Sequence, residues 1–287
     1  MMNTPFQRIA VVGLGLIGGS LVKSFRCNAP ECKLIGVDSQ DILAAAREYI
    51  DEAYAPENLA RAVLDADLIF LATPIKTILQ QLPEVARSIR RGAVATDVGS
   101  TKSLIVAEAH KHFTGERFFI GGHPLAGREK GGWENAVADL FENAAYVLTP
   151  SSQLPAHLSE AVTQLLQTLG ARVIKLEPET HDRLVAEISH LPQLLAVALM
   201  NSTVRDKISA ELALRLAGSG FRDMTRLAAS PFAIWQDILD SNRANVRRSL
   251  QEFIVALQKL AQAFDHDDLE PHFTQANRLR QNLAARR

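Results

Sequence analysis

Three glycines near the start of the chain have the spacing of a phosphate-binding turn. The segment V-V-G-L-G-L-I-G places Gly13, Gly15 and Gly18 in the pattern G-x-G-x-x-G. Between a strand and a helix, the first glycine makes a tight turn, the second lets the backbone approach a pyrophosphate, and the third lets the helix pack on the strand. Leu16 and Ile17 would begin the helix, whose free N–H groups favour anions. The pattern predicts a dinucleotide-binding loop.

An acidic residue follows this loop at the distance expected for a nicotinamide dinucleotide site. Asp38 lies 20 residues after Gly18, at the end of the second predicted strand. Its carboxylate can bind the hydroxyls of the adenosine ribose there. The same carboxylate would repel a 2′-phosphate, and no arginine immediately follows it. We therefore expect NAD as the cofactor, with NADP less favoured.

Two further strand ends are expected to meet the cofactor. Thr73 and Pro74 end one predicted strand, and the segment D-V-G-S, which finishes with Ser100, ends the next. Ligands of open α/β sheets bind outside the carboxyl ends of the strands, so both turns should line the nicotinamide side. Each segment also has the composition of an ordinary turn.

A histidine in a glycine-rich segment is a candidate proton acceptor. His123 lies in G-G-H-P-L-A-G, residues 121–127, where a predicted strand ends. A neutral imidazole at this place could accept a proton from a substrate hydroxyl while a hydride leaves the same carbon. A structural role for the histidine in its glycine-rich loop fits these residues equally well.

Alternating strand and helix patterns over the first 178 residues would position these groups. The predicted strands span residues 8–13, 33–38, 67–73, 93–98, 118–121, 145–149 and 172–177. The predicted helices between them include residues 17–27, 41–49, 76–90, 102–112 and 154–169. Because nearly all of these strands are apolar throughout, we expect a parallel sheet that is covered on both faces. The fold class is therefore α/β, with an N-terminal Rossmann dinucleotide-binding domain.

The strand patterns end at Pro178, and helical periodicity continues to the end of the chain. We predict a Rossmann NAD-binding domain over residues 1–178 and an all-α domain over residues 179–287. One helix in the second domain has apolar residues at alternating spacings of four and three. These are Val246, Leu250, Phe253, Leu257, Leu260 and Phe264. Such a seam packs on another helix, either within the core or across a subunit interface.

Composition narrows the class of protein. The 287 residues include 31 Lys+Arg and 32 Asp+Glu, a net charge of -1, which argues against a nucleic-acid partner. Hydrophobic residues make up 47%, as in soluble globular proteins. Cys27 and Cys32 have no partners at zinc-ligand spacing, so we expect reduced thiols and no metal site. Residues 188–204 are uncharged but contain His190 and Pro192, so we expect a buried helix, no membrane contact and a cytoplasmic protein.

Six segments, taken together and in order, resemble one enzyme family. They are G-L-G-L-I-G-G-S-L (13–21), D-V-G-S-T-K (97–102), G-G-H-P-L-A-G (121–127), S-H-L-P (189–192), G-F-R-D-M-T-R (220–226) and W-Q-D-I (235–238). This set is similar to the motifs of the prephenate and arogenate (cyclohexadienyl) dehydrogenases. The resemblance implies an oxidoreductase of tyrosine biosynthesis that uses NAD(P). Prephenate would be oxidatively decarboxylated to 4-hydroxyphenylpyruvate, or arogenate to tyrosine.

The resemblance also implies roles for individual residues. His123 matches the catalytic histidine that hydrogen-bonds the C4 hydroxyl, and Ser100 matches the serine that orients this hydroxyl. Arg226 matches the arginine that binds a substrate carboxylate, while His190 and Trp235 match residues of the substrate pocket. The family implies a homodimer through the helical domain, which favours the interface reading of the apolar seam.

Some alternatives stay open at this point. Arg128 stands where many relatives have a small polar residue; it could be a second cation beside the pocket, favouring prephenate over arogenate, or a solvated surface residue. An arogenate dehydrogenase and a catalytically silent NAD-responsive dimer are the alternative functions. A 3-hydroxyacid dehydrogenase would need a lysine on the first helix of the second domain, and residues 180–204 contain none.

Overall fold

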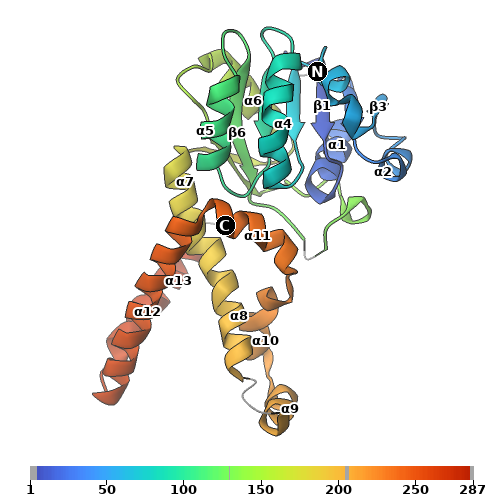
Figure 1. Cartoon of the computed structure of the whole chain (residues 1–287). Helices are drawn as coiled ribbons and strands as arrows, with labels where there is room; N and C mark the ends of the chain where they lie inside the picture. Colours follow the sequence, from blue (N-terminus) through green and yellow to red (C-terminus); the bar gives the residue numbers. More distant parts are fainter. Residues whose placement is uncertain (1–4, 129, 204–206, 285–287) are drawn as a thin grey trace.

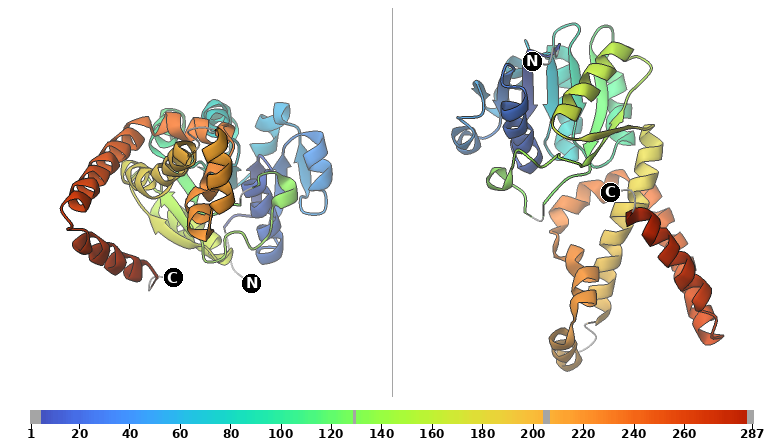
Figure 2. Two further views of the ribbon diagram at one scale, coloured as in Figure 1. Left: turned by 90° about the horizontal axis from the view of Figure 1, so that it is seen from below. Right: turned by 180° about the vertical axis from the view of Figure 1, so that it is seen from behind.

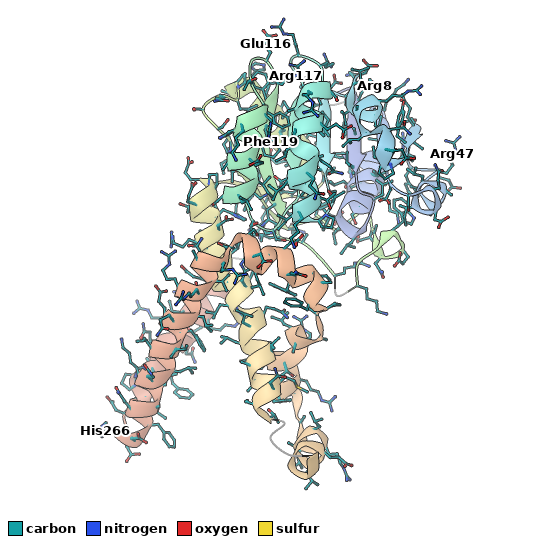
Figure 3. All side chains as sticks on the ribbon, viewed as in Figure 1. Arg8, Arg47, Glu116, Arg117, Phe119 and His266 are labelled. Carbon is teal, nitrogen blue, oxygen red and sulfur yellow. The ribbon has the colours of Figure 1, made fainter. Side chains whose placement is uncertain are left out.

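The structure is a computed structural model that describes residues 5–128, 130–203 and 207–284. An α/β domain is built on one eight-stranded sheet, and a set of helices extends from one side of that domain (Figure 1). Glu116 and Arg117, which precede a central strand, lie at the opposite side (Figure 3). The carboxyl ends of the parallel strands therefore face the helices, where ligands of open α/β sheets bind.

The strand order is β3-β2-β1-β4-β5-β6-β7-β8. The strands are β1 (Arg8–Val12), β2 (Lys33–Val37), β3 (Glu52–Tyr54), β4 (Leu68–Leu71), β5 (Val94–Asp97), β6 (Phe118–Pro124), β7 (Ala145–Thr149) and β8 (Arg172–Lys175). From β1 the chain adds β2 and β3 on one side, and it then returns to add β4 and the later strands on the other side of β1. The gap between β1 and β4 is therefore the switch point of a doubly wound fold. The predicted α/β class with an N-terminal Rossmann domain is confirmed.

The prediction of a parallel sheet is wrong for one pair of strands. β7 runs antiparallel to β6, with His123 opposite Val147, and all other pairs are parallel. A parallel pair needs a long crossover, usually an α-helix. Between β6 and β7 the described residues form only one short 3-10 helix, Trp133–Asn135, so the chain returns in the opposite direction. The short strand β3 was not predicted because its three residues contain no apolar run.

Helices cover both faces of the sheet, as expected. They are α1 (Leu16–Asn28), α2 (Gln40–Ala45), α3 (Leu59–Val63), α4 (Ile75–Ser88), α5 (Ser103–His112) and α6 (Ala156–Thr168). Phe25 of α1 and Leu165 of α6 belong to the buried cluster on one face. Leu82 of α4 and Ile105 of α5 belong to the cluster on the other face. The alternate side chains of each strand feed these two clusters, which fixes the layers.

After β8 the regular structure of the described residues is helical. It comprises α7 (Pro178–Val185), a π-helical turn (Ala186–His190), α8 (Leu191–Thr203), α9 (Lys207–Leu216), α10 (Ser219–Thr225), α11 (Phe232–Ser241), α12 (Arg243–Asp265) and α13 (Glu270–Ala284). The hydroxyl groups of Thr101 and Ser241 are 2.8 Å apart, and Lys76 pairs with Asp237 at 3.0 Å. These contacts join α11 to the loop after β5 and to the first turn of α4.

The expected burial of the helix around residues 188–204 holds only on one side. His190 and Gln193 are buried, whereas the side chain of Ile188 is 65% exposed. By length and composition alone, the described stretch Pro178–Thr203 could cross a membrane, and 28% of its apolar window is buried in the protein. Its first turns, however, hold the buried side chains of His181 and Asp182 against α5, which is the packing of a helix in a folded domain.

Two helical arms diverge from the sheet domain. One contains α8, α9 and α10, and the other contains α12 and α13 (Figure 1, Figure 2). The apolar seam lies along α12: Val246 is buried near its start, whereas Leu257 is 49% and Phe264 is 69% exposed toward its far end. His266, just after α12, marks that far end (Figure 3). The second half of the seam is therefore open in the single chain.

Candidate active site

The loop between β1 and α1 has the backbone geometry that a pyrophosphate needs. Gly13 has φ +90°, and a Cβ there would lie 2.8 Å from the carbonyl oxygen of Ala72. A Cβ on Gly18 would lie only 1.8 Å from the carbonyl oxygen of Gly13, so helix and loop are in direct contact. A Cβ on Gly15 would meet no atom within 4 Å. The middle glycine thus faces open space at the N-terminus of α1, where a phosphate can approach the backbone.

Asp38 lies beside this loop at the end of β2. Its carboxylate accepts the N–H of Leu14 at 2.6 Å and the N–H of Ser39 at 2.7 Å. These bonds hold the half-buried carboxylate beside the glycine loop. Together with the glycine cradle, the position and charge of this group fit the adenosine ribose of a dinucleotide such as NAD.

A cleft of about 440 Å³ lies between the strand ends and α11. It is lined by Leu16, Ile17, Ala72, Thr73, Pro74, Ile75, Val98, Gly99, Ser100, Ala233, Ile234, Asp237 and Ile238. The two predicted strand-end turns and the start of α1 therefore meet in one cavity, whose size is ordinary for a small-molecule site. The helical domain supplies its opposite wall, which the sequence did not predict.

His123 is 8% exposed and lies within β6, which ends three residues after the predicted end of this strand at residue 121. Its Nδ1 is 2.8 Å from Nε2 of His181, and the two rings meet edge to face. Burial, followed by the nearby charges of His181, Lys102 and His190, lowers the pKa of His123 well below its usual value. The imidazole is therefore neutral at physiological pH, as a proton acceptor must be.

A buried ion pair fixes the loop that carries Ser100. The side chains of Lys102 and Asp97 are in contact and fully buried. The Asp97 carboxylate also accepts the N–H of Gly99 at 2.8 Å and the N–H of Gly122 at 3.1 Å. Burial raises the pKa of Asp97 and lowers that of Lys102, and the attraction between the two charges opposes both shifts. The pair ties the Ser100 loop to the strand residue that precedes His123.

The predicted residues of the helical domain lie in two groups. His190 is buried, with Nδ1 3.3 Å from the Asn242 amide nitrogen, and its ring contacts Trp235 edge to face. Burial is the main cause that lowers the pKa of His190 to about 4. The indole Nε1 of Trp235 is buried and has no hydrogen-bond partner among the described residues. Arg226 instead lines a second cavity of about 340 Å³.

Arg128 lines that second cavity together with Arg226. The other lining residues are Gly127, Leu227, Ala229 and Ser230. The loop after β6 and the segment after α10 thus place two arginines on one cavity. Planar guanidinium groups bind carboxylates in pairs of hydrogen bonds. His123, His190 and Trp235 line neither of these two cavities.

Sequence reasoning did not identify His181, Asp182 and Lys102 as parts of the site. His181 and Asp182 begin a helix, where polar residues are common as caps, so their positions gave no distinct signal. Lys102 belongs to a recognised segment, but nothing in its neighbours indicated that its ammonium group is buried. The contacts of these residues depend on the packing of α7 against α5, which no local pattern encodes.

Comparisons with known proteins agree with this arrangement. The family profile described as "Prephenate dehydrogenase, nucleotide-binding domain" matches residues 21–175, and the profile "Prephenate dehydrogenase, dimerization domain" matches residues 177–279. The chain is 36% identical to the prephenate dehydrogenase of Bacillus subtilis over 276 residues, which covers 95% of this chain and 74% of the relative.

Solved structures of related enzymes superpose over nearly the whole chain. The Synechocystis arogenate dehydrogenase has a TM-score of 0.84 and 34% identity, covering 96% of this chain and 99% of the other. The Aquifex aeolicus prephenate dehydrogenase in complex with hydroxyphenyl propionate and NAD+ has a TM-score of 0.89 and 26% identity, with 100% of both chains covered. Both halves of the sequence are matched in order, and the chain belongs to the prephenate dehydrogenase family.

Proposed function

We propose that this protein is an NAD-dependent prephenate dehydrogenase, which forms 4-hydroxyphenylpyruvate from prephenate in tyrosine biosynthesis. The observation that carries the proposal is a neutral, buried His123 beside a nucleotide-binding cleft. Asp97 connects the two, because its carboxylate holds both Gly122, next to His123, and Gly99, which lines the cleft with Ser100. A relative named prephenate dehydrogenase, 36% identical over 95% of this chain, supports the same assignment.

The residues of this chain would divide the work as follows. The glycine loop and Asp38 hold the dinucleotide, and bound NAD supplies the acceptor for the hydride that leaves C4 of the substrate. Ser100 orients the C4 hydroxyl, and His123 accepts its proton while the hydride leaves C4, so that C4 becomes a carbonyl carbon. When CO2 leaves, the electron pair of the broken bond makes the ring aromatic, and the oxygen on C4 takes up a proton to become the phenol hydroxyl. Arg226 binds a carboxylate, and Trp235, whose buried indole N–H has no hydrogen-bond partner among the described residues, is assigned to the substrate pocket by the family resemblance.

The second arginine of the substrate cavity favours prephenate over arogenate. Prephenate carries two carboxylates and no cation, whereas arogenate carries an ammonium group beside its side-chain carboxylate. Arg128 and Arg226 line the same cavity, so an additional ammonium group there would meet a second positive charge. Arogenate remains the alternative substrate, since the Synechocystis relative at 34% identity is an arogenate dehydrogenase.

We also propose a homodimer formed by the helical domain, a cytoplasmic location and a domain boundary at Pro178. The open half of the α12 seam and the family's description of residues 177–279 as a dimerization domain support the dimer. The end of β8 at Lys175 and the start of α7 at Pro178 support the boundary. Cys27 and Cys32 are both free, which is typical of a reducing compartment.

The first experiment measures absorbance of the reduced nicotinamide with prephenate or arogenate, each with NAD or NADP. We expect the highest kcat/KM for prephenate with NAD. Four flat traces from folded protein that binds NAD would contradict the proposed function.

His123→Asn should lower kcat by about 100-fold or more while NAD still binds, because the proton acceptor is lost.

Asp38→Asn should weaken NAD binding, because the charged acceptor for the ribose hydroxyls becomes neutral. We expect KM for NAD to rise roughly tenfold or more, as for loss of a hydrogen bond to a charged group. The NAD-to-NADP preference should fall in parallel, since the repulsion of a 2′-phosphate is removed. Asp41→Asn, an exposed change in the first turn of α2, is the matched control. An unchanged KM for NAD would remove Asp38 from the cofactor site.

Arg128→Gln should separate the two substrates. We expect KM for prephenate to rise about tenfold, while KM for arogenate stays the same or falls, because the change removes one positive charge and leaves a polar side chain. Arg226→Gln should raise KM for both substrates. Lys130→Gln is the control, since this exposed lysine is near Arg128 but does not line the cavity. Equal KM changes for both substrates in Arg128→Gln would refute its role in preference.

The double variant Leu257→Glu and Phe264→Glu tests the dimer. Both side chains are largely exposed in the single chain, so the monomer should remain folded while charges on the seam disrupt an interface. We expect analytical ultracentrifugation to show a shift from dimer to monomer at micromolar concentration. Gln262→Glu, on the opposite side of α12, should remain dimeric. A dimer that persists in the double variant would place the interface elsewhere.

A further inference from the structure

Three buried side chains from two domains form a continuous hydrogen-bonded row. Nδ1 of His123, on β6, is 2.8 Å from Nε2 of His181, on α7. Nδ1 of His181 is 2.8 Å from Oδ1 of Asp182. His181 and Asp182 are each 1% exposed. Water therefore has little access to the row, and its protons must be arranged among its own members.

The Asp182 end of the row fixes the direction of every hydrogen bond. Oδ1 of Asp182 accepts the N–H of Lys102 at 2.6 Å, and Oδ2 accepts the N–H of Ser103 at 2.9 Å, at the start of α5. Burial opposes ionisation of this carboxyl group, but the hydrogen bonds from His181, Lys102 and Ser103 together hold the pKa of Asp182 below its usual value. An ionised carboxylate only accepts hydrogen bonds, so Nδ1 of His181 must be the donor.

When His181 is in its neutral form, this donor fixes the proton positions on both rings. A neutral imidazole has one N–H, so Nε2 of His181 is left as an acceptor. The group that faces it, Nδ1 of His123, must then carry the N–H, which leaves Nε2 of His123 with its lone pair. A doubly protonated His181 would instead force the proton of His123 onto Nε2 and block it as a base.

We propose that His181 and Asp182 are positioning residues that hold His123 as the Nδ1–H tautomer, with Nε2 free to accept the proton of the substrate hydroxyl. This inference rests on the proposed function for the identity of the hydroxyl. In the step, the substrate O–H bond breaks and an Nε2–H bond forms on His123. The resulting imidazolium keeps its Nδ1–H bond to Nε2 of His181, and no proton leaves the row.

The charges around His123 explain why such a row is needed. Burial disfavours a positive charge on the ring, the charge of Lys102 adds to this effect, and the Asp97 carboxylate is already paired with Lys102. The Asp182 carboxylate, acting through His181, is the negative charge aligned with Nδ1 of His123. It stabilises the imidazolium that forms, in the same way that a buried carboxylate stabilises a catalytic histidine in hydrolase triads.

The row crosses from one domain to the other. His123 belongs to the Rossmann sheet, whereas His181 and Asp182 belong to the first helix of the helical domain. The proton acceptor is therefore oriented only when α7 is docked on α5.

The direct test is the protonation state of the His123 ring in the wild-type protein, measured by ¹⁵N NMR of ring-labelled histidine. The chain has eight histidines, and the His123→Asn variant identifies the resonances of His123 by their loss. We expect a protonated Nδ1 and an unprotonated Nε2 at neutral pH without substrate. A proton on Nε2 would overturn the proposal. The measurement needs no turnover, so it stays informative even if the proposed reaction is not observed.

Two substitutions at His181 separate positioning from general structure. In His181→Asn the shorter amide can still donate to Asp182 but cannot reach His123, and we expect kcat to fall about 100-fold with KM for NAD unchanged. In His181→Gln the amide oxygen lies near the former Nε2 and can accept from His123, so we expect kcat to recover at least tenfold over His181→Asn. His157→Asn, exposed on α6, is the control. Equal losses in both variants, or wild-type kcat in His181→Asn, would overturn the proposal.

Discussion

The Asp182 carboxylate occupies the point where the two domains are joined, and the active site depends on it. A buried carboxylate is costly unless hydrogen bonds replace its lost hydration. Here the two free N–H groups at the start of α5 supply that replacement, helped by the positive end of the helix dipole. The carbonyl oxygen of the same residue accepts the side-chain N–H of Asn242 at 2.7 Å. The beginning of α7, α5 and the segment before α12 are therefore fixed to one another by a single residue.

The buried pair of Lys102 and Asp97 transmits this constraint to the catalytic groups. Lys102 offers its backbone N–H to Asp182 and its ammonium group to Asp97, which in turn holds Gly99 and Gly122. Removing one member of a buried ion pair leaves an uncompensated buried charge, which is strongly destabilising. The positions of the backbone segments that the pair holds are therefore tightly fixed. The close packing around Asp97 also requires a glycine at position 122, because a Cβ there would lie 2.5 Å from the carbonyl oxygen of Asp97. The loop that carries Ser100 and the strand that carries His123 are thus held together by one buried ion pair.

The Rossmann half was predictable because its signals are local. The spacing of Gly13, Gly15 and Gly18 and the position of Asp38 determine a loop, a helix start and a strand end, and the structure has all of these elements. The direction of β7 was not predictable from the strand's own residues, which have the same apolar character as the parallel strands; only the lack of a crossover helix decides it. The pairing of Arg128 with Arg226 and of His123 with His181 joins residues that are 98 and 58 positions apart. Such contacts depend on how the two domains dock. From the sequence alone, Arg128 could be either a second cation beside the pocket or a solvated surface residue.

The apolar surface that the helical domain leaves exposed follows from how the two domains share the cleft. Each domain contributes one wall of the cleft, so the helical domain must present α11 and the start of α7 to the sheet rather than enclose a large core of its own. Many of its apolar side chains, including those on the far half of α12, are then left on the surface of the single chain. Large exposed apolar surfaces on soluble proteins are usually covered by a partner. A second helical domain packed along the seam would bury these side chains and also fix the direction of the arms. Dimer formation would in this way support the docking of α7 on α5, on which the orientation of His123 depends.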